Sequence, residues 1–308
     1  MSQEFINYHD QILLLKSKGL VINDETFAMD KLKECGYFSL IGGYKDIFKD
    51  PSTRKFVNTS FEDIYRLYQF DYSLRNLIFK FLCEFEEKFT ESLSYNFCLY
   101  YGENQNQYLN AKNYELIYLS EDELSKLIKI MNNIIIKDNQ HPYIVHHRNK
   151  YGNVPLWVLL KSMQFGNKVY LYSAMKPNIK FNISKNFISL NSKQLFQISQ
   201  NLVLFRNVCA HNERLYSFRT IKNFPDTLIH KKMKIPKKGE QYICGKNDLF
   251  GVVISLKLLL PKETFKIFMK ESKKLISRYL KSNYRLTNCI LLKYMGFPEN
   301  WKNITRYK

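Results

Sequence analysis

The sequence predicts an all-α fold, and three observations support this. Only 11 Gly and 8 Pro occur in 308 residues, so few positions interrupt a helix. A hydrophobic fraction of 45%, rich in Tyr and Phe, is ample for a folded core. Apolar residues also recur at three- and four-residue spacing over long segments, which is the period of an amphipathic helix. The length allows for about two domains.

The first predicted helix with clear boundary signals lies near the N-terminus. Asn23 or Asp24 is a suitable N-cap for a helix that runs to about Glu34, and Gly36 is its stop signal. Segment 37–44 is aromatic, ends in a double glycine, and is expected to pack against the core. We assign residues 1–58 to an N-terminal helical extension.

A long amphipathic helix follows, and Ser60 with Asp63 forms a plausible capping box at its start. Its apolar positions have helical spacing: Leu74, Leu77, Ile78, Leu82, Phe85, Phe89 and Leu93. The opposite face carries Glu84, Glu87 and Glu91. Such a cluster is able to bind a divalent metal, but glutamates on a helix surface are more often solvated, so we expect no metal site.

The centre of the chain contains a polar, basic segment at 141–151. It carries His141, His146, His147, Arg148 and Lys150. These side chains are suited to contact RNA or ligate metal, but a solvated loop is the favoured interpretation. Pro155 and Trp157 then open a helix that is expected to run from Leu156 to about Phe165 and to stop at Gly166.

The segment 192–216 is predicted to be a helix with two chemically different sides. The apolar side holds Leu195, Ile198, Leu202, Phe205 and Cys209. The spacing of 207, 211 and 214 places Asn207, His211 and Arg214 together on the other side. Arg206 falls on the flank, nearer the apolar side, and reaches His211 only if its side chain is extended or the helix is locally broken.

This cluster suits metal-free RNA cleavage. His211 is able to take the proton from a ribose 2′-hydroxyl or give one to the leaving oxygen. Arg206 is suited to hold the phosphate and offset its growing charge, and Asn207 to donate to a phosphate oxygen or orient the imidazole.

A single histidine does not easily serve as both base and acid, so two copies from two subunits would make a better site. The apolar residues Phe196, Val203 and Leu204 lie near the polar side and indicate that a second subunit covers it. The alternative is a central helix that is buried all round.

The last third of the chain is strongly basic. Segment 230–238 is a basic linker, and a last helical region is expected from Leu249 to about Leu291. Its cations are Lys262, Lys266, Lys270, Lys273, Lys274, Arg278, Lys281 and Arg285. Such a helical face is compatible with RNA tracking or merely with solubility. The candidate RNA-contacting residues are Arg214, Arg148, Lys231, Lys232, Lys237 and Lys238.

Charge and composition also limit which binding partners and which cellular compartment are expected. A formal net charge of +19 makes nucleic acid the leading partner class, while a lysine-rich proteome is the alternative explanation. Six scattered cysteines without a CxxC pair indicate reduced core thiols. The polar N-terminus is unlike a signal peptide, and the apolar run 254–260 is too short to span a bilayer. We expect a soluble, cytoplasmic protein that makes no membrane contact.

The segment 206–216 (RNVCAHNERLY) resembles the signature of HEPN-domain nucleases, which is an arginine, a polar residue, a short spacer and a histidine. More narrowly, the chain resembles bacterial abortive-infection (Abi) proteins of the AbiD/AbiF type. Three other stretches are similar to that family: 15–20 leading into 36–44, 68–75 (YQFDYSLR), and Pro155-Leu156-Trp157 followed by Phe165-Gly166. Together they cover roughly residues 12–220.

The resemblance implies a HEPN-type helical bundle at 59–220, between the N-terminal extension and a basic C-terminal helical region at 221–308. It also implies a homodimer with a composite active site, and a metal-independent endoribonuclease toxin of phage defence that needs no cofactor. An RNA or protein antitoxin would hold such a toxin in check. Carried over, Arg206, Asn207 and His211 form the catalytic set.

One feature departs from the family pattern. Relatives carry an arginine shortly after a glutamate in the first long helix, whereas Glu86 is followed here by Glu87, Lys88, Phe89 and Thr90. Two other functions are weighed against the nuclease. One is a non-catalytic RNA-binding HEPN module with a regulatory or sensor role. The other is a metal-dependent nuclease that uses Glu84, Glu87 and Glu91.

Overall fold

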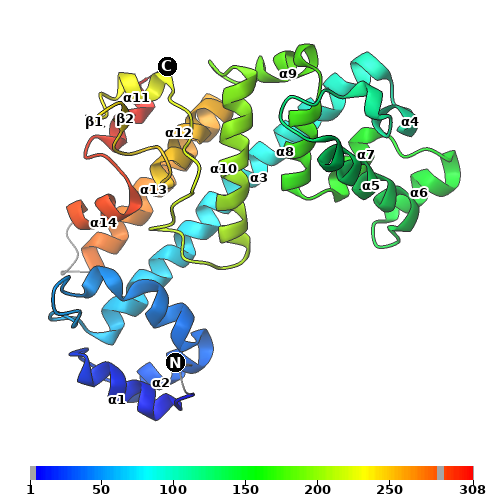
Figure 1. Ribbon diagram of the computed structural model, residues 1–308. Coiled ribbons are helices and arrows are strands. Elements are labelled where there is room, and N and C mark those ends of the chain that lie inside the picture. The colour runs from blue at the N-terminus through cyan, green and yellow to red at the C-terminus, as the bar shows by residue number, and fades with distance from the viewer. Residues whose placement is uncertain (1–4, 283–287, 308) are drawn as a thin grey trace.

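The computed structural model describes residues 5–282 and 288–307 and confirms the all-α prediction. In these ranges the only paired strands are β1 (Lys237–Lys238) and β2 (Gln241–Tyr242), which form a short antiparallel ribbon. Every other regular element is a helix or a helical turn (Figure 1).

The helix α3 (Phe61–Tyr101) is the axis around which the other helices pack. It has 41 residues and is therefore about 60 Å long. The predicted capping box is confirmed: the Ser60 hydroxyl accepts from the Asp63 backbone N–H (3.3 Å), and the Asp63 carboxylate accepts from the Ser60 N–H (2.9 Å). The predicted apolar positions are buried, except for Leu77, which is half-buried.

The N-terminal elements lie beside the first turns of α3 (Figure 1). In chain order they are α1 (Tyr8–Ser17), α2 (Glu25–Cys35), the π-helical turn η1 (Phe38–Gly42) and the 3₁₀ turn η2 (Asp46–Phe48). Asp24 caps α2 and Gly36 ends it with a φ of 77°, as predicted. Leu40, Ile41 and Tyr44 are buried, so the aromatic segment does pack against the core.

Short helices surround the C-terminal half of α3. They are α4 (Gln105–Tyr108), η3 (Ala111–Asn113), α5 (Glu121–Lys137), α6 (Pro142–Tyr151), α7 (Leu156–Ser162), α8 (Phe165–Ala174) and α9 (Pro177–Ser184).

Two predictions in this region are wrong. Segment 141–151 is not a loop: Pro142 opens α6 and Gly152 closes it in the left-handed conformation. Gly166 does not end a helix but lies in the first turn of α8, because the chain turns earlier, where Met163 and Gln164 are extended.

The C-terminal elements begin with α10 (Ser192–Ala210), which crosses α3 (Figure 1). They continue as α11 (Leu228–Lys232), the β1–β2 ribbon, α12 (Leu249–Leu259), α13 (Lys262–Ser282), α14 (Asn288–Met295) and η4 (Trp301–Arg306). The predicted helical region from Leu249 is confirmed, and it consists of separate helices. Leu260 is extended because it precedes Pro261, and this separates α12 from α13. Arg285 lies outside the described residues.

The apolar run near Leu256 is the buried helix α12. Apart from Lys257, every residue of α12 is buried, as expected for a helix that is hydrophobic all round. Its 11 residues span about 16 Å, well short of a bilayer core. Across the described part of the chain, no helix combines the length and the apolar character needed to cross a membrane.

The cysteines remain unpaired, and all six lie within the described ranges. Cys209 and Cys244 are buried, and Cys35, Cys83 and Cys98 are half-buried. Cys289 is exposed on α14, so the expectation of core thiols is wrong at this position.

The basic linker predicted at 230–238 is partly a folded element. It contains the end of α11 and the strand β1, and His230 is fully buried. The His230 Nε2 atom lies 3.0 Å from the Gly245 carbonyl oxygen, and its Nδ1 atom accepts from the Thr227 N–H at 3.2 Å. Burial lowers the pKa of His230 below its usual value, so the imidazole is neutral in the folded protein.

This burial predicts a pH-dependent stability. In the unfolded chain His230 takes up a proton near pH ~6.5, whereas the folded protein binds that proton only at lower pH. The stabilisation is therefore present above pH ~6.5 and is lost as the pH falls below that value. We expect His230→Gln to reduce the fall in the free energy of unfolding between pH 7.5 and 5.5, measured by urea titration.

The matched control is His146→Gln, because His146 is exposed on α6 and should leave the pH dependence unchanged. Identical pH dependence of the parent and His230→Gln would contradict the assignment.

Candidate functional site

The helix α10 presents the predicted polar residues at its C-terminal end. Its apolar side is confirmed, since Leu195, Ile198, Leu202, Phe205 and Cys209 are all buried. The helix ends at Ala210 in a Schellman motif: the Glu213 N–H donates to the Val208 carbonyl (3.0 Å) and the Asn212 N–H to that of Cys209 (3.4 Å). Asn212 supplies the required positive φ of 56°. His211 is therefore the C-cap residue.

The expectation of a helix through residue 216 is wrong. The predicted position of Arg214 on the polar side of that helix is therefore wrong as well. An asparagine in the left-handed conformation ends the helix before Arg214, so this residue does not share a helical face with Asn207. The Arg214 Nη1 atom instead donates to the Gly43 carbonyl at 2.9 Å, which links the segment to the N-terminal region.

His211 and Asn207 remain neighbours, one helical turn apart. The His211 backbone N–H donates to the Asn207 carbonyl (2.9 Å). Asn207 is half-buried and His211 is exposed. Within the described ranges, no hydrogen bond or ion pair engages the His211 imidazole, which leaves it accessible to a substrate.

Arg206 lies against α3 rather than beside His211. Its Nε atom is 3.7 Å from the Glu86 carboxylate, and its guanidinium lies over the Phe79 ring at 5.7 Å. This Nε is buried and has no hydrogen-bond partner among the described residues. The side chain is 31% exposed, so part of the guanidinium faces solvent.

Glu86 is shared between two cations. Its second carboxylate oxygen accepts from the Lys168 Nζ of α8 at 2.8 Å, and Lys168 is almost fully buried. The Glu86–Lys168 pair therefore fixes the carboxylate that contacts Arg206. The two cations and the one carboxylate together carry a net positive charge. Lys168 and Phe79 could not be predicted from the sequence, because only the packing of α8, α3 and α10 brings them together with Arg206.

Arg206 and His211 leave α10 in different directions. Five residues on a helix correspond to about 140° of rotation, and no hydrogen bond or ion pair joins the two side chains across the described residues. They occupy adjacent sides of the last turns of α10. A substrate phosphate would have to lie over the helix end to meet both.

A buried network holds the chain that follows His211. The Asp71 carboxylate accepts from the Tyr44 hydroxyl (2.7 Å), Arg75 Nη1 (2.8 Å) and the backbone N–H groups of Leu215 (2.9 Å) and Tyr216 (2.7 Å). Arg75 Nη1 also donates to the Glu213 carbonyl at 3.2 Å. Burial and the adjacent carboxylate raise the pKa of Tyr44, so its hydroxyl stays a neutral donor.

The comparison with protein families identifies the chain. The family model for Abi-like proteins matches residues 30–217, so the chain belongs to the Abi-like protein family. The match spans α2 to the segment after α10 and includes Arg206, Asn207, His211 and the Asp71 network. Membership supports a role in abortive infection. No curated protein and no solved structure matches the chain.

Arg148 lies away from α10 and holds two helices together. Its Nη1 atom donates to the carbonyls of Ile135 (3.0 Å), Ile136 (3.0 Å) and Asp138 (3.1 Å), and Nη2 donates to the Asn139 side chain (2.7 Å). The guanidinium thereby donates to backbone carbonyl groups at the C-terminal end of α5 that have no partner within the helix. Its contact with RNA stays a prediction.

The four predicted lysines are also remote from His211. Lys231, Lys232, Lys237 and Lys238 are exposed on α11 and β1. The segment before α11 contacts the first turn of α10, where Gln194 donates to the Asp226 carbonyl (3.0 Å). Since a helix rises ~1.5 Å per residue, this contact is roughly 25 Å from His211 along α10.

The glutamates considered for metal binding lie on the exposed side of α3. Glu84, Glu87 and Glu91 are exposed, and Glu91 pairs with Lys161 at 3.0 Å. In the residues that the structure describes, no group of three or more His, Cys, Asp or Glu side chains is arranged to hold a metal ion.

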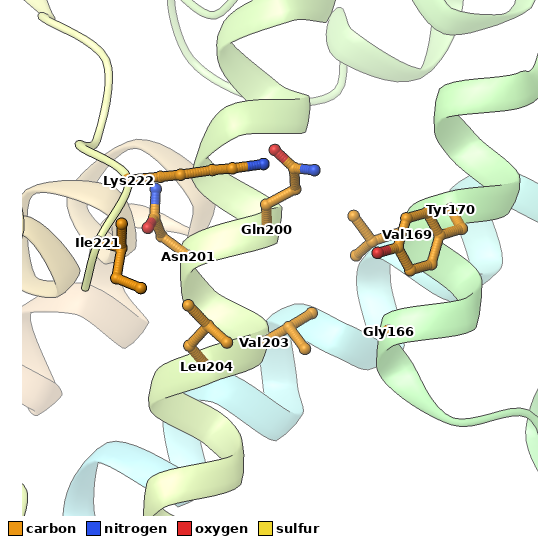
Figure 2. A pocket seen from close by; sticks show the side chains of 9 residues that line it. All are labelled: Gly166, Val169, Tyr170, Gln200, Asn201, Val203, Leu204, Ile221 and Lys222. Carbon is orange, nitrogen blue, oxygen red and sulfur yellow. The ribbon is translucent and has the colours of Figure 1, made fainter. Parts of the chain in front are cut away.

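An apolar groove of about 340 Å³ lies between α10 and α8, close to Arg206 in sequence (Figure 2). Val169 and Tyr170 of α8 face Val203 and Leu204 of α10 across it, and residues 221–222 close one side. Leu204 is 43% exposed, so α10 is not buried all round. Phe196 is different: it is buried against Tyr118 of the same chain and needs no second subunit to cover it.

The buried network predicts a large loss of stability on mutation. Asp71→Asn leaves the Arg75 guanidinium buried without its counter-charge, which costs about 3–5 kcal/mol. Tyr44→Phe removes a hydroxyl that donates to Asp71 and accepts from Arg75, and because both partners are charged it costs about 1.5–3 kcal/mol. Both are measured as the free energy of unfolding in urea.

The control is Tyr72→Phe, whose exposed side chain on α3 should change stability by less than ~0.5 kcal/mol. An Asp71→Asn variant as stable as Tyr72→Phe would refute the role given to the network.

Proposed function

We propose that this Abi-like protein is a metal-independent HEPN endoribonuclease toxin of phage defence. The observation that carries the proposal is the geometry at the end of α10. An unpaired, exposed His211 caps the helix, while Arg206 is held on the adjacent side by Glu86. This pair supplies a proton carrier and a phosphate ligand.

His211 would act on the attacking nucleophile. It takes the proton from a ribose 2′-hydroxyl, whose oxygen then attacks the adjacent phosphorus while the bond to the 5′-oxygen breaks. The products are a 2′,3′-cyclic phosphate and the leaving 5′-oxygen, which takes up a proton to become a 5′-hydroxyl. Imidazole suits this step because it changes protonation near neutral pH.

Arg206 would bind the phosphate under attack. The Glu86–Lys168 pair and the Phe79 ring hold its Nε side, so the partly exposed guanidinium has a fixed direction. Charge on the phosphate oxygens grows in the transition state, and an arginine placed in advance stabilises that charge. Asn207 lies one turn before His211 and would orient the phosphate or the imidazole.

A homodimer would complete the site. One histidine serves poorly as both base and acid, and Arg206 and His211 leave α10 about 140° apart. The apolar groove supports a second subunit on this side, because Leu204 and Tyr170 are exposed along the middle of α10, and Leu204 lies two helical turns before His211 on the same side of the helix. A composite site would place one copy's His211 opposite the other's.

The cell would need to restrain such an enzyme, so we propose an RNA or protein antitoxin.

The second candidate function is a non-catalytic RNA-binding HEPN module. The separation of Arg206 from His211 within one chain favours it, since binding phosphate requires no proton transfer.

The catalytic assignment predicts that Arg206→Ala and His211→Ala each lower RNA cleavage by about 10²–10⁴-fold. Cleavage is followed on labelled RNA, with and without excess chelator, and growth arrest on induction is scored in parallel. His146→Ala is the matched control, because it removes an exposed histidine on α6.

If the parent and both variants bind RNA equally well and leave it equally intact, the binding module is correct instead. Loss of parental cleavage in chelator would point to the metal-dependent class.

The dimer proposal predicts that Leu204→Arg yields a monomer with at least about 10²-fold less cleavage activity, because a charge in the apolar groove opposes association. Mass and activity are measured together by size-exclusion chromatography with light scattering. Ile136→Arg, at an exposed position on α5, is the control. A parent protein that is monomeric at micromolar concentration and fully active would end the composite-site proposal.

A further inference from the structure

The positive charge of this protein is concentrated in its last quarter. Residues 228–308 contain 19 Lys and Arg against 5 Asp and Glu, a net charge of +14. Residues 1–227 contain 28 against 23, a net charge of +5. A proteome-wide preference for lysine would raise the count everywhere, so this uneven distribution needs a local explanation.

The helix α13 carries much of this charge on its outer side. Its inner side is buried, with Phe265, Phe268, Met269, Ser272, Ile276 and Tyr279 packed toward the core. Six exposed cations form what we name the α13 basic row: Lys262, Lys266, Lys270, Lys274, Arg278 and Lys281. Successive cations at four-residue spacing are separated by about 6 Å along the helix. The one acidic residue exposed beside them is Glu263, which pairs with Lys266 (2.8 Å).

Other cations extend both ends of the row. At the start, burial lowers the pKa of Lys257 on α12, and repulsion from Lys262, Lys232 and Lys266 lowers it further. Three helices therefore bring lysines together at this end. At the other end, Arg278 and Arg66 of α3 line one small cavity of about 160 Å³ with the hydroxyls of Ser73 and Ser282.

The α13 basic row lies on the side of α3 away from Arg206. Phe81 and Phe70 of α3 face α13, where they stack on Phe268 (5.2 Å) and Tyr279 (4.6 Å). Phe79 and Glu86 face Arg206, and at 100° per residue they lie on roughly the opposite side of the helix from Phe81 and Phe70. The row is thus separate from the proposed cleavage site at the end of α10.

We propose that the α13 basic row is a docking surface for the phosphate backbone of single-stranded RNA. Evenly spaced cations fit a repeating chain of phosphates and carry no sequence preference. A membrane fits less well, because Ile267 is the one large apolar side chain exposed on α13 and the rest of its apolar side is used in packing. The choice of RNA as the ligand rests on the proposed function. The existence of a cationic surface on α13 does not depend on it.

The test measures RNA affinity against salt concentration. The full-length His211→Ala protein, which would not cleave, is titrated with a labelled 20-nucleotide RNA. The same protein with Lys266→Gln, Lys270→Gln, Lys274→Gln and Arg278→Gln is compared with it. Removing four phosphate contacts should reduce the slope of log K against log salt by about 3, and weaken binding on the order of 100-fold at 0.15 M salt.

Two matched variants make the test specific. Lys55→Gln, Lys112→Gln, Lys129→Gln and Lys137→Gln remove the same charge from exposed positions elsewhere and should change the slope by less than about 1. Replacing Lys266, Lys270 and Lys274 by Arg keeps the charge and should keep the slope. Equal thermal unfolding of all variants shows that the fold is intact.

The proposal is overturned if the row variant and the control variant lose equal affinity, because the attraction is then diffuse. It is also overturned if RNA binding is unchanged while binding to vesicles containing phosphatidylserine, or to an acidic protein, is lost. In the protein that keeps His211, the four Gln substitutions in the α13 basic row should raise KM for RNA cleavage and leave kcat unchanged. Cleavage that survives His211→Ala would refute the proposed catalysis without affecting this binding result.

Discussion

The buried ion pair between Asp71 and Arg75 is the interaction on which the rest of the site depends. Both side chains are essentially inaccessible, so removing one partner would leave the other as an unpaired buried charge. Tyr44 and the backbone N–H groups of residues 215 and 216 satisfy the Asp71 carboxylate, whereas Arg75 is hydrogen-bonded through Nη1 and its buried Nε and Nη2 have no partner among the described residues. The N-terminal region, the long helix α3 and the chain after His211 are therefore fixed to one another at a single point.

The two candidate catalytic residues are held by separate means. The Schellman motif and the Asp71 network fix the backbone at His211 and leave its imidazole exposed. Arg206 depends on Glu86, which in turn depends on Lys168 from α8. The supports come from different helices, so the two side chains are positioned independently of each other. This arrangement is consistent with a site that is completed by a substrate or by a second copy of the chain.

The long helix α3 lies between the two surfaces for which we propose a function. On one side α10 carries the small polar group with Arg206 and His211, and on the other α13 carries a row of cations. Most of the net charge lies in the C-terminal quarter, beyond the part of the chain that defines the family. The proposed catalysis and the proposed capture of RNA thus fall in different parts of the sequence, as expected if phosphate attraction brings RNA to the protein before a site selects one bond.

The sequence by itself determined the all-α class, the capping box at Ser60, the apolar positions of α3 and the buried side of α10, because these follow from local signals and helical period. It also identified Arg206, Asn207 and His211 as the candidate catalytic residues. It failed at Asn212, where a left-handed residue ended the helix before Arg214, and at 141–151, where polar composition concealed a helix. Only the tertiary structure decided that Lys168 and Glu86 support Arg206, that Arg148 caps α5, and that Asp71 holds residues 215 and 216. These contacts join residues that are distant in the sequence, and their partners are chosen by packing rather than by spacing along the chain.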